Sequence, residues 1–141
     1  MSRRRDKKIK AKEANGGPRI KSPSSGSQHD STQNTTPLFC FCGLTGNYCL
    51  SKCNGEQKSA FADTIHKLSK LTWAQIATAD RHGSGHEKIA RGSLRGVTIP
   101  ADLTEDVDIL AFRFCGMMPM LGYRLGRVFH VIALDRNHVA Y

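Results

Sequence analysis

Residues 109–134, ILAFRFCGMMPMLGYRLGRVFHVIAL, determine the fold expected for this 141-residue chain. Three short blocks in this stretch are rich in aromatic and branched apolar residues, which is typical of strands. Glycine and proline stand between the blocks and indicate tight turns. The expected strands cover 109–115, 120–124 and 127–134.

Alternation along these strands predicts which side chains share a face. In the first strand, Leu110, Phe112 and Phe114 define an apolar face, and Arg113 lies on the opposite one. In the third strand, one row holds Val128, His130, Ile132 and Leu134, and the other holds Arg127, Phe129, Val131 and Ala133. We expect this strand to be central, because both rows are largely apolar, with a turn at 135–138 and a closing edge strand at 139–141.

The preceding residues predict one more strand and two helices. A short apolar run at 38–42 lies between a proline and a glycine, as buried strands often do. Asn54, with Gln57 three residues later, indicates a helix start, and an apolar stripe continues to about residue 70. Thr72 opens a second helix that ends near residue 80. The order predicts an α+β domain in which two helices cover an antiparallel sheet.

The N-terminal residues predict a tail without a core of its own. Residues 1–36 contain almost no apolar side chain, so we expect a disordered basic arm and a polar linker, followed by a single domain at 37–141. Residues 1–21 hold nine Lys/Arg and two acidic residues, a net +7 of the chain's +9. Such an arm attracts phosphate backbones, although a charge run is often only a solvated tail. The nucleic-acid-binding candidates in it are Arg3, Arg4, Arg5, Lys7, Lys8, Lys10 and Lys12.

A second cationic stretch, RHGSGHEKIARGSLR, covers residues 81–95. Its glycines would allow backbone amides and cations, among them Lys88, to surround a phosphate. We therefore add Arg91 and Arg95 to the nucleic-acid-binding candidates. Ordinary loop chemistry is the alternative interpretation.

Cysteine and hydropathy patterns bear on metal content and cellular location. The chain has no apolar run long enough for a membrane span, and no apolar segment follows its basic N-terminus. Together with five cysteines, an odd number, this predicts a cytoplasmic protein. Four of them follow the pattern C-x-C-x6-C-x3-C, at Cys40, Cys42, Cys49 and Cys53. We expect no bound metal and interpret them as small buried hydrophobes, with a zinc site as the open alternative.

The element order and the stretch LAFRFCGMMPMLGYRLGRVFHVIALDRNHVAY resemble the RelE-like toxin superfamily of bacterial toxin–antitoxin systems, over about residues 56–141. The resemblance implies a small toxin that cleaves RNA, often on the ribosome, without a metal, and that a cognate antitoxin neutralises. It also implies a site of arginines on the strands and an aromatic residue near the C-terminus. The matching catalytic candidates are Arg113, Arg124, His130, Tyr141 and Lys88, with Arg91 as a loop contributor.

His130 is the expected acid or base, because imidazole titrates near neutrality. Arg113 and Arg124 are the expected phosphate clamps. A histidine on an apolar face is, alternatively, an ordinary core residue. The sequence thus predicts an RNA-directed, toxin-like protein that acts as a metal-independent endoribonuclease, provided that these three groups converge. The alternatives are a non-catalytic nucleic-acid- or ribonucleoprotein-binding accessory protein and a small zinc-stabilised interaction module.

Overall fold

A computed structural model describes residues 32–81 and 83–141 of the chain. Both predicted helices are present. Helix α2 covers Gly55–Leu68 and α3 covers Trp73–Thr78. Each begins with a capping box, in which the side chain of the first cap residue and a glutamine three positions later satisfy each other's backbone N–H groups. In α2, the two reciprocal hydrogen bonds between Asn54 and Gln57 are both 2.9 Å long.

Five strands of the described residues form one sheet in the order β1-β5-β4-β3-β2. Their bounds are Leu38–Cys40 for β1, Glu87–Ile89 for β2, Ile109–Cys115 for β3, Met118–Leu125 for β4 and Val128–Leu134 for β5. The strands β2 to β5 pair in antiparallel fashion, whereas β1 runs parallel to β5. The α+β class is confirmed, and the prediction of a purely antiparallel sheet is wrong.

The closing edge strand predicted at 139–141 is also absent, because another segment takes its place. The free edge of β5 is paired with β1, and the backbone N–H of Leu38 donates to the carbonyl of Arg127 at 3.0 Å. Residues 139–141 instead follow a turn, and Tyr141 packs against the apolar cluster on one face of the sheet. Composition identified β1 as a strand but could not give its direction or its partner.

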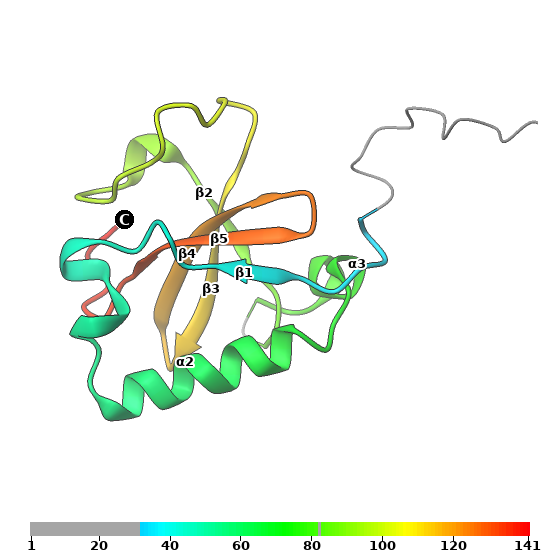
Figure 1. The fold of residues 1–141 in the computed structure, drawn as a ribbon, viewed down its shortest axis with the longest axis horizontal. Helices are drawn as coiled ribbons and strands as arrows, with labels where there is room; N and C mark the ends of the chain where they lie inside the picture. Colours follow the sequence, from blue (N-terminus) through cyan, green and yellow to red (C-terminus); the bar gives the residue numbers. More distant parts are fainter. Residues whose placement is uncertain (1–31, 82) are drawn as a thin grey trace, which may run out of the picture.

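The two faces of the sheet carry separate apolar clusters. Figure 1 shows α2 below the sheet and the connection between β2 and β3 above it. The helix-side cluster contains Phe61, Leu68, Trp73, Ile76, Leu110, Phe112, Phe114, Met120, Phe129, Val131 and Leu134, among others. The loop-side cluster contains Ile109, Ala111, Leu121, Tyr123, Ile132, Ala133 and Ala140, covered by residues of the 94–107 segment. Because both faces are covered, polar side chains reach solvent mainly at the margins of the sheet.

A bulge in the β4–β5 pair changes the faces predicted for β5. The pairing passes from Gly122–Val131 to Leu121–Ala133, so Ile132 is an extra residue. Beyond it, Leu134 joins the helix-side cluster, although strict alternation placed it in the row of His130. The prediction that Leu134 shares a face with His130 is therefore wrong.

The residues just before β1 are part of the folded unit. The carbonyls of Gln33 and Thr35 accept hydrogen bonds from the backbone of Ala74 and Trp73, at 2.9 and 3.0 Å. Residues 32–36, which the sequence assigned to the linker, thus contact α3. The rest of the predicted arm, residues 1–31, lies outside the described residues. Among the described residues, no helix has the length and apolar character needed to cross a membrane.

Candidate functional site

The edge strand β2 sends adjacent side chains to opposite faces of the sheet. Glu87 pairs with Ala111 and Lys88 pairs with Leu110. Ala111 belongs to the loop-side cluster and Leu110 to the helix-side cluster. Because directly opposed residues share a face, Glu87 points to the loop side and Lys88 to the helix side. A different pocket lies on each side of this strand.

Four of the five predicted catalytic residues are divided between these pockets. Arg113 and Tyr141 line a depression of about 90 Å³ on the loop side. Lys88 and Arg124 line a larger pocket of about 490 Å³ on the helix side. His130 lines neither of them. The expected convergence of Arg113, Arg124 and His130 is therefore not found.

Strand pairing explains the separation. Arg124 pairs with Phe129, whose ring lies in the helix-side cluster, so its guanidinium is on that face. The next pair, Tyr123 and His130, points to the loop side, where the two rings stack at 4.8 Å between centroids and 10° between planes. His130 is thus half-buried against an aromatic ring.

The loop-side depression brings together several groups that acid–base chemistry uses. We call it the C-terminal depression, lined by Arg81, Glu87, Ala111, Arg113, Met117, Pro119, His138 and Tyr141. The hydroxyl of Tyr141 donates to Glu87 Oε1 at 3.0 Å. The guanidinium of Arg81 approaches Glu87 Oε2 at 3.5 Å. The carboxylate therefore stands between a hydroxyl donor and a cation.

The turn after β5 shapes the rim of the depression. The side chain of Asp135 is buried, with 1% of its surface exposed. Its carboxylate oxygens accept from the backbone N–H groups of Val139 at 3.0 Å and Ala140 at 2.7 Å. Within this turn His138 has a φ of 53°, a left-handed conformation that is uncommon for a residue other than glycine. Such conformations cost free energy and cluster at functional sites.

The turn also places two side chains side by side. The ring centroids of His138 and Tyr141 are 5.6 Å apart. Burial, followed by the hydrogen bond to Glu87, raises the pKa of Tyr141 to about 12, although Arg113 acts in the opposite direction. The phenol is consequently protonated at neutral pH and acts as a hydrogen-bond donor.

The sequence did not identify three residues of this depression as catalytic candidates. Arg81 lies in the connection between α3 and β2, and Glu87 is the first residue of that short edge strand. His138 belongs to a turn whose composition indicated only a bend. Glu87 and Tyr141 are 54 positions apart in the chain. The sequence offered one signal for Glu87: it is the only acidic residue in the cationic stretch 81–95.

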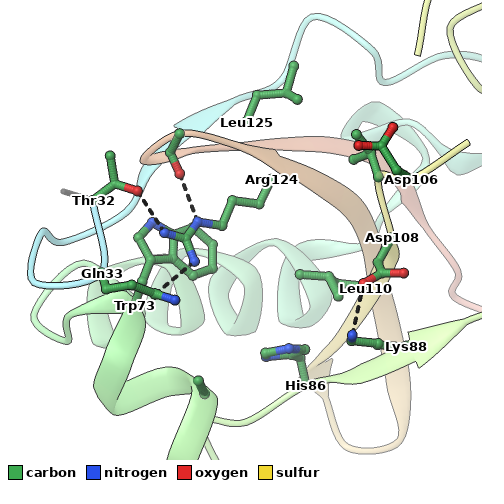
Figure 2. A pocket seen from close by; sticks show the side chains of 13 residues that line it. Thr32, Gln33, Trp73, His86, Lys88, Asp106, Asp108, Leu110, Arg124 and Leu125 are labelled. Atoms are coloured by element: carbon green, nitrogen blue, oxygen red, sulfur yellow. Dashed lines mark hydrogen bonds and ion pairs between the residues drawn. The ribbon is translucent and has the colours of Figure 1, made fainter. Parts of the chain in front are cut away.

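The helix-side pocket is built around Arg124, and we call it the Arg124 pocket (Figure 2). The guanidinium carbon lies 4.4 Å from the ring centroid of Trp73, a cation–π contact. Its nitrogens donate to the carbonyl of Gly126 at 2.7 Å, to Gln33 Oε1 at 3.1 Å and to Thr32 Oγ1 at 3.0 Å. Arg124 therefore holds the residues before β1 against the β4–β5 turn.

The residues predicted to bind nucleic acid line neither of the two pockets among the described residues. The guanidinium of Arg91 donates to the carbonyls of Leu103, Thr104 and Val107, so it ties the β2–β3 connection together. Arg95 is exposed. The arm candidates, Arg3, Arg4, Arg5, Lys7, Lys8, Lys10 and Lys12, lie outside the described residues.

The cysteine cluster does not form a recognisable metal centre in the described part of the chain. Across residues 32–81 and 83–141, no three His, Cys, Asp or Glu side chains are grouped so as to hold an ion. Cys53 is buried, whereas Cys42 is exposed. Hydrogen bonds from the backbone N–H and then the side chain of Cys42 lower the pKa of the Cys40 thiol.

Comparisons with protein-family models, with curated proteins and with solved structures find no match to this chain. No relative therefore assigns a role to any residue of the two pockets.

Proposed function

We propose that the protein is a toxin-like, metal-independent endoribonuclease whose catalytic groups line the C-terminal depression. One observation carries the proposal: a carboxylate, an imidazole, a phenol and two guanidinium groups border a single small depression. These are the groups that cleavage of RNA by its own 2′-hydroxyl requires. The depression, at about 90 Å³, suits the scissile phosphate rather than a whole nucleotide.

Each step has a side chain in the depression. Glu87 accepts the proton of the 2′-hydroxyl, whose oxygen then attacks the adjacent phosphorus. As the bond from phosphorus to the 5′-oxygen breaks, His138 donates a proton to that leaving oxygen. The products are a 2′,3′-cyclic phosphate and a free 5′-hydroxyl.

The remaining groups act on charge and orientation. Arg81 and Arg113 neutralise the negative charge that develops on the phosphate oxygens, as guanidinium groups do in planar, two-point contacts. Tyr141 is a positioning residue, because its hydrogen bond orients the Glu87 carboxylate. Asp135 positions His138 through the turn.

The substrate follows from the same chemistry. The attack requires a 2′-hydroxyl, so the substrate is RNA, free or on the ribosome, and DNA is not cleaved. The net +7 of residues 1–21 adds sequence-independent attraction to the phosphate backbone. As a toxin, the protein would act in the cytoplasm and would require a cognate antitoxin as its protein partner.

Cleavage of an end-labelled oligoribonucleotide in chelator tests the proposal. The full chain should give a cyclic phosphate product, and a 2′-deoxy nucleotide at the cut site should prevent cleavage. Glu87→Gln and His138→Ala should each lower the rate by about 10²–10⁴-fold, the usual contribution of acid–base catalysis. Glu105→Gln, on an exposed loop, is the matched control.

Two results would overturn the proposal. One is cleavage that persists in both Glu87→Gln and His138→Ala. The other is salt-dependent RNA binding without any cleavage, which would favour a non-catalytic binding protein instead. In cells, expression of the wild-type chain should arrest growth, and Glu87→Gln should relieve the arrest.

A further inference from the structure

We propose that the Arg124 pocket is a nucleotide-binding site, separate from the C-terminal depression. It lies on the helix side of the sheet, whereas the depression lies on the loop side. Nothing in the proposed cleavage reaction uses it. The size of the pocket, its fixed guanidinium and the balance of its charges all suit a nucleotide.

The size and walls of the pocket fit a small organic molecule. Its volume of about 490 Å³ lies within the range of roughly 300–1,000 Å³ that ligand pockets occupy. The apolar part of the wall comes from Trp73, Ala77, Val107, Leu110 and Leu125. The polar part comes from the residues before β1, from β2 and the residue before it, from β4 and from the β2–β3 connection.

Arg124 offers a rigid, planar surface. The indole of Trp73 supports one side of the guanidinium, and three oxygen acceptors fix its edge (Figure 2). Because these contacts are already made, a ligand would not have to order the side chain on binding. Nucleobases stack on arginine planes as they do on aromatic rings. We place the base on the side of the guanidinium that is opposite the indole.

His86 adds an imidazole that is neutral at physiological pH. Its ring centroid is 5.3 Å from that of Phe112, and its Nδ1 is buried without a hydrogen-bond partner. Burial, followed by the charges of Lys88 and Arg124, lowers the pKa of His86. The imidazole therefore contributes polarity without adding a third cation.

The charged side chains of the pocket are two cations, Arg124 and Lys88, and two carboxylates, Asp106 and Asp108. A bare anion would be attracted by the first pair and repelled by the second. A nucleotide satisfies both, since its phosphate is an anion and its base and ribose carry N–H and O–H donors. The mixed lining thus favours a nucleotide over inorganic phosphate.

Lys88 is available for the phosphate. Its Nζ lies 2.9 Å from Asp108 Oδ2, with 71% and 55% of the two side chains exposed. An exposed ion pair of this kind is weak in water. A ligand phosphate can therefore take the ammonium, which leaves Asp108 to accept from the ribose or the base.

Trp73 provides the assay, because it is the only tryptophan of the chain and lines the pocket. Its fluorescence is followed while the full chain is titrated with AMP, GMP or inorganic phosphate. A 2′-O-methyl pentanucleotide, which the proposed nuclease cannot cleave, represents a nucleotide within an RNA strand. A saturable change is expected with the mononucleotides, and binding of the pentanucleotide as well would identify the strand as a source.

Variants connect the signal to the pocket. Lys88→Gln and Asp106→Asn should each weaken binding about tenfold, the usual effect of losing one charge-assisted hydrogen bond. Lys58→Gln, exposed on α2, should not change it. Glu87→Gln should bind nucleotide like the wild type while losing cleavage, so the two sites can fail independently.

Two outcomes would overturn the nucleotide site. The first is an unchanged Trp73 emission with every nucleotide probe up to about 1 mM, the concentration scale of very weak binding. The second is an equal response to inorganic phosphate, which would reduce the pocket to a simple anion site.

Discussion

Replacement of Asp135 by alanine tests how the C-terminal depression is built. The Asp135 carboxylate is buried and accepts two backbone N–H groups, those of Val139 and Ala140. A hydrogen bond to a charged group contributes about 1.5–3 kcal/mol, and a buried N–H left without a partner costs a similar amount. Val139 is exposed, so its N–H can turn to water, whereas Ala140 is fully buried. We therefore expect Asp135→Ala to lower the free energy of unfolding by about 2–4 kcal/mol.

Asp135→Asn separates the loss of stability from the loss of positioning. The amide keeps one acceptor oxygen, so we expect a smaller loss of about 1–2 kcal/mol. Urea unfolding followed by Trp73 fluorescence measures both values, because this buried indole changes its environment on unfolding. Asp63→Asn, exposed on α2, should change the free energy by less than about 0.5 kcal/mol.

The same variants give a catalytic readout. Asp135→Asn should remain folded but cleave RNA more slowly, since His138 is held in its left-handed conformation by this turn. Equal stability of Asp135→Ala and the wild type would show that the two hydrogen bonds do not hold the turn. Full cleavage activity in a folded Asp135→Asn would show that the turn does not position the imidazole.

Three further perturbations test other parts of the structure. Gly122→Ala should cost about 1–3 kcal/mol of stability in urea unfolding, because a Cβ there would lie 2.2 Å from the backbone carbonyl oxygen of His130 and 2.6 Å from the ring of Phe129. Gly92→Ala, in open space, should be nearly neutral. In a spectrophotometric titration, one tyrosine should ionise with a pKa of about 12, and Tyr141→Phe should remove it. Because this folded-state pKa exceeds the unfolded value of 10.0, its stabilisation is complete below pH 10 and is lost as the pH rises toward 12. NMR titration should give His86 a pKa below 6.5, and a pKa above 6.5 would contradict its buried placement. Because the pKa is lower in the folded protein than in the unfolded chain, the folded protein loses stability as the pH falls below 6.5.

Local signals predicted most of the helices and strands. The bounds of β3 agree residue for residue with the apolar block at 109–115, and both capping boxes mark the helix starts. Such features depend on neighbours in the chain, so the sequence contains them. The parallel pairing of β1 with β5 joins Leu38 to Val128 across the whole domain, and no local pattern encodes that choice. The bulge at Ile132 is similar, because its partner strand determines where alternation breaks.

The candidate site was predicted less well, for the same reason. Arg113 and Tyr141 both line the C-terminal depression. Arg124 and His130 do not join them, because strand pairing turns the first to the helix side and seats the second on Tyr123. Glu87 could not be recognised, since only the fold brings it to the C-terminus.

The two proposed sites meet at β2, and this gives a test of both. Helices cover one face of the sheet and the β2–β3 connection covers the other, so functional side chains reach solvent at this edge. Exchange of the adjacent residues, Glu87→Lys with Lys88→Glu, keeps the net charge but reverses the charge that each pocket receives. Both side chains are at least partly exposed, so the free energy of unfolding should change by less than about 1 kcal/mol. RNA cleavage and the nucleotide response of Trp73 should both be lost. Retention of either activity in the exchanged protein would mean that the corresponding pocket does not depend on the side chain that β2 provides.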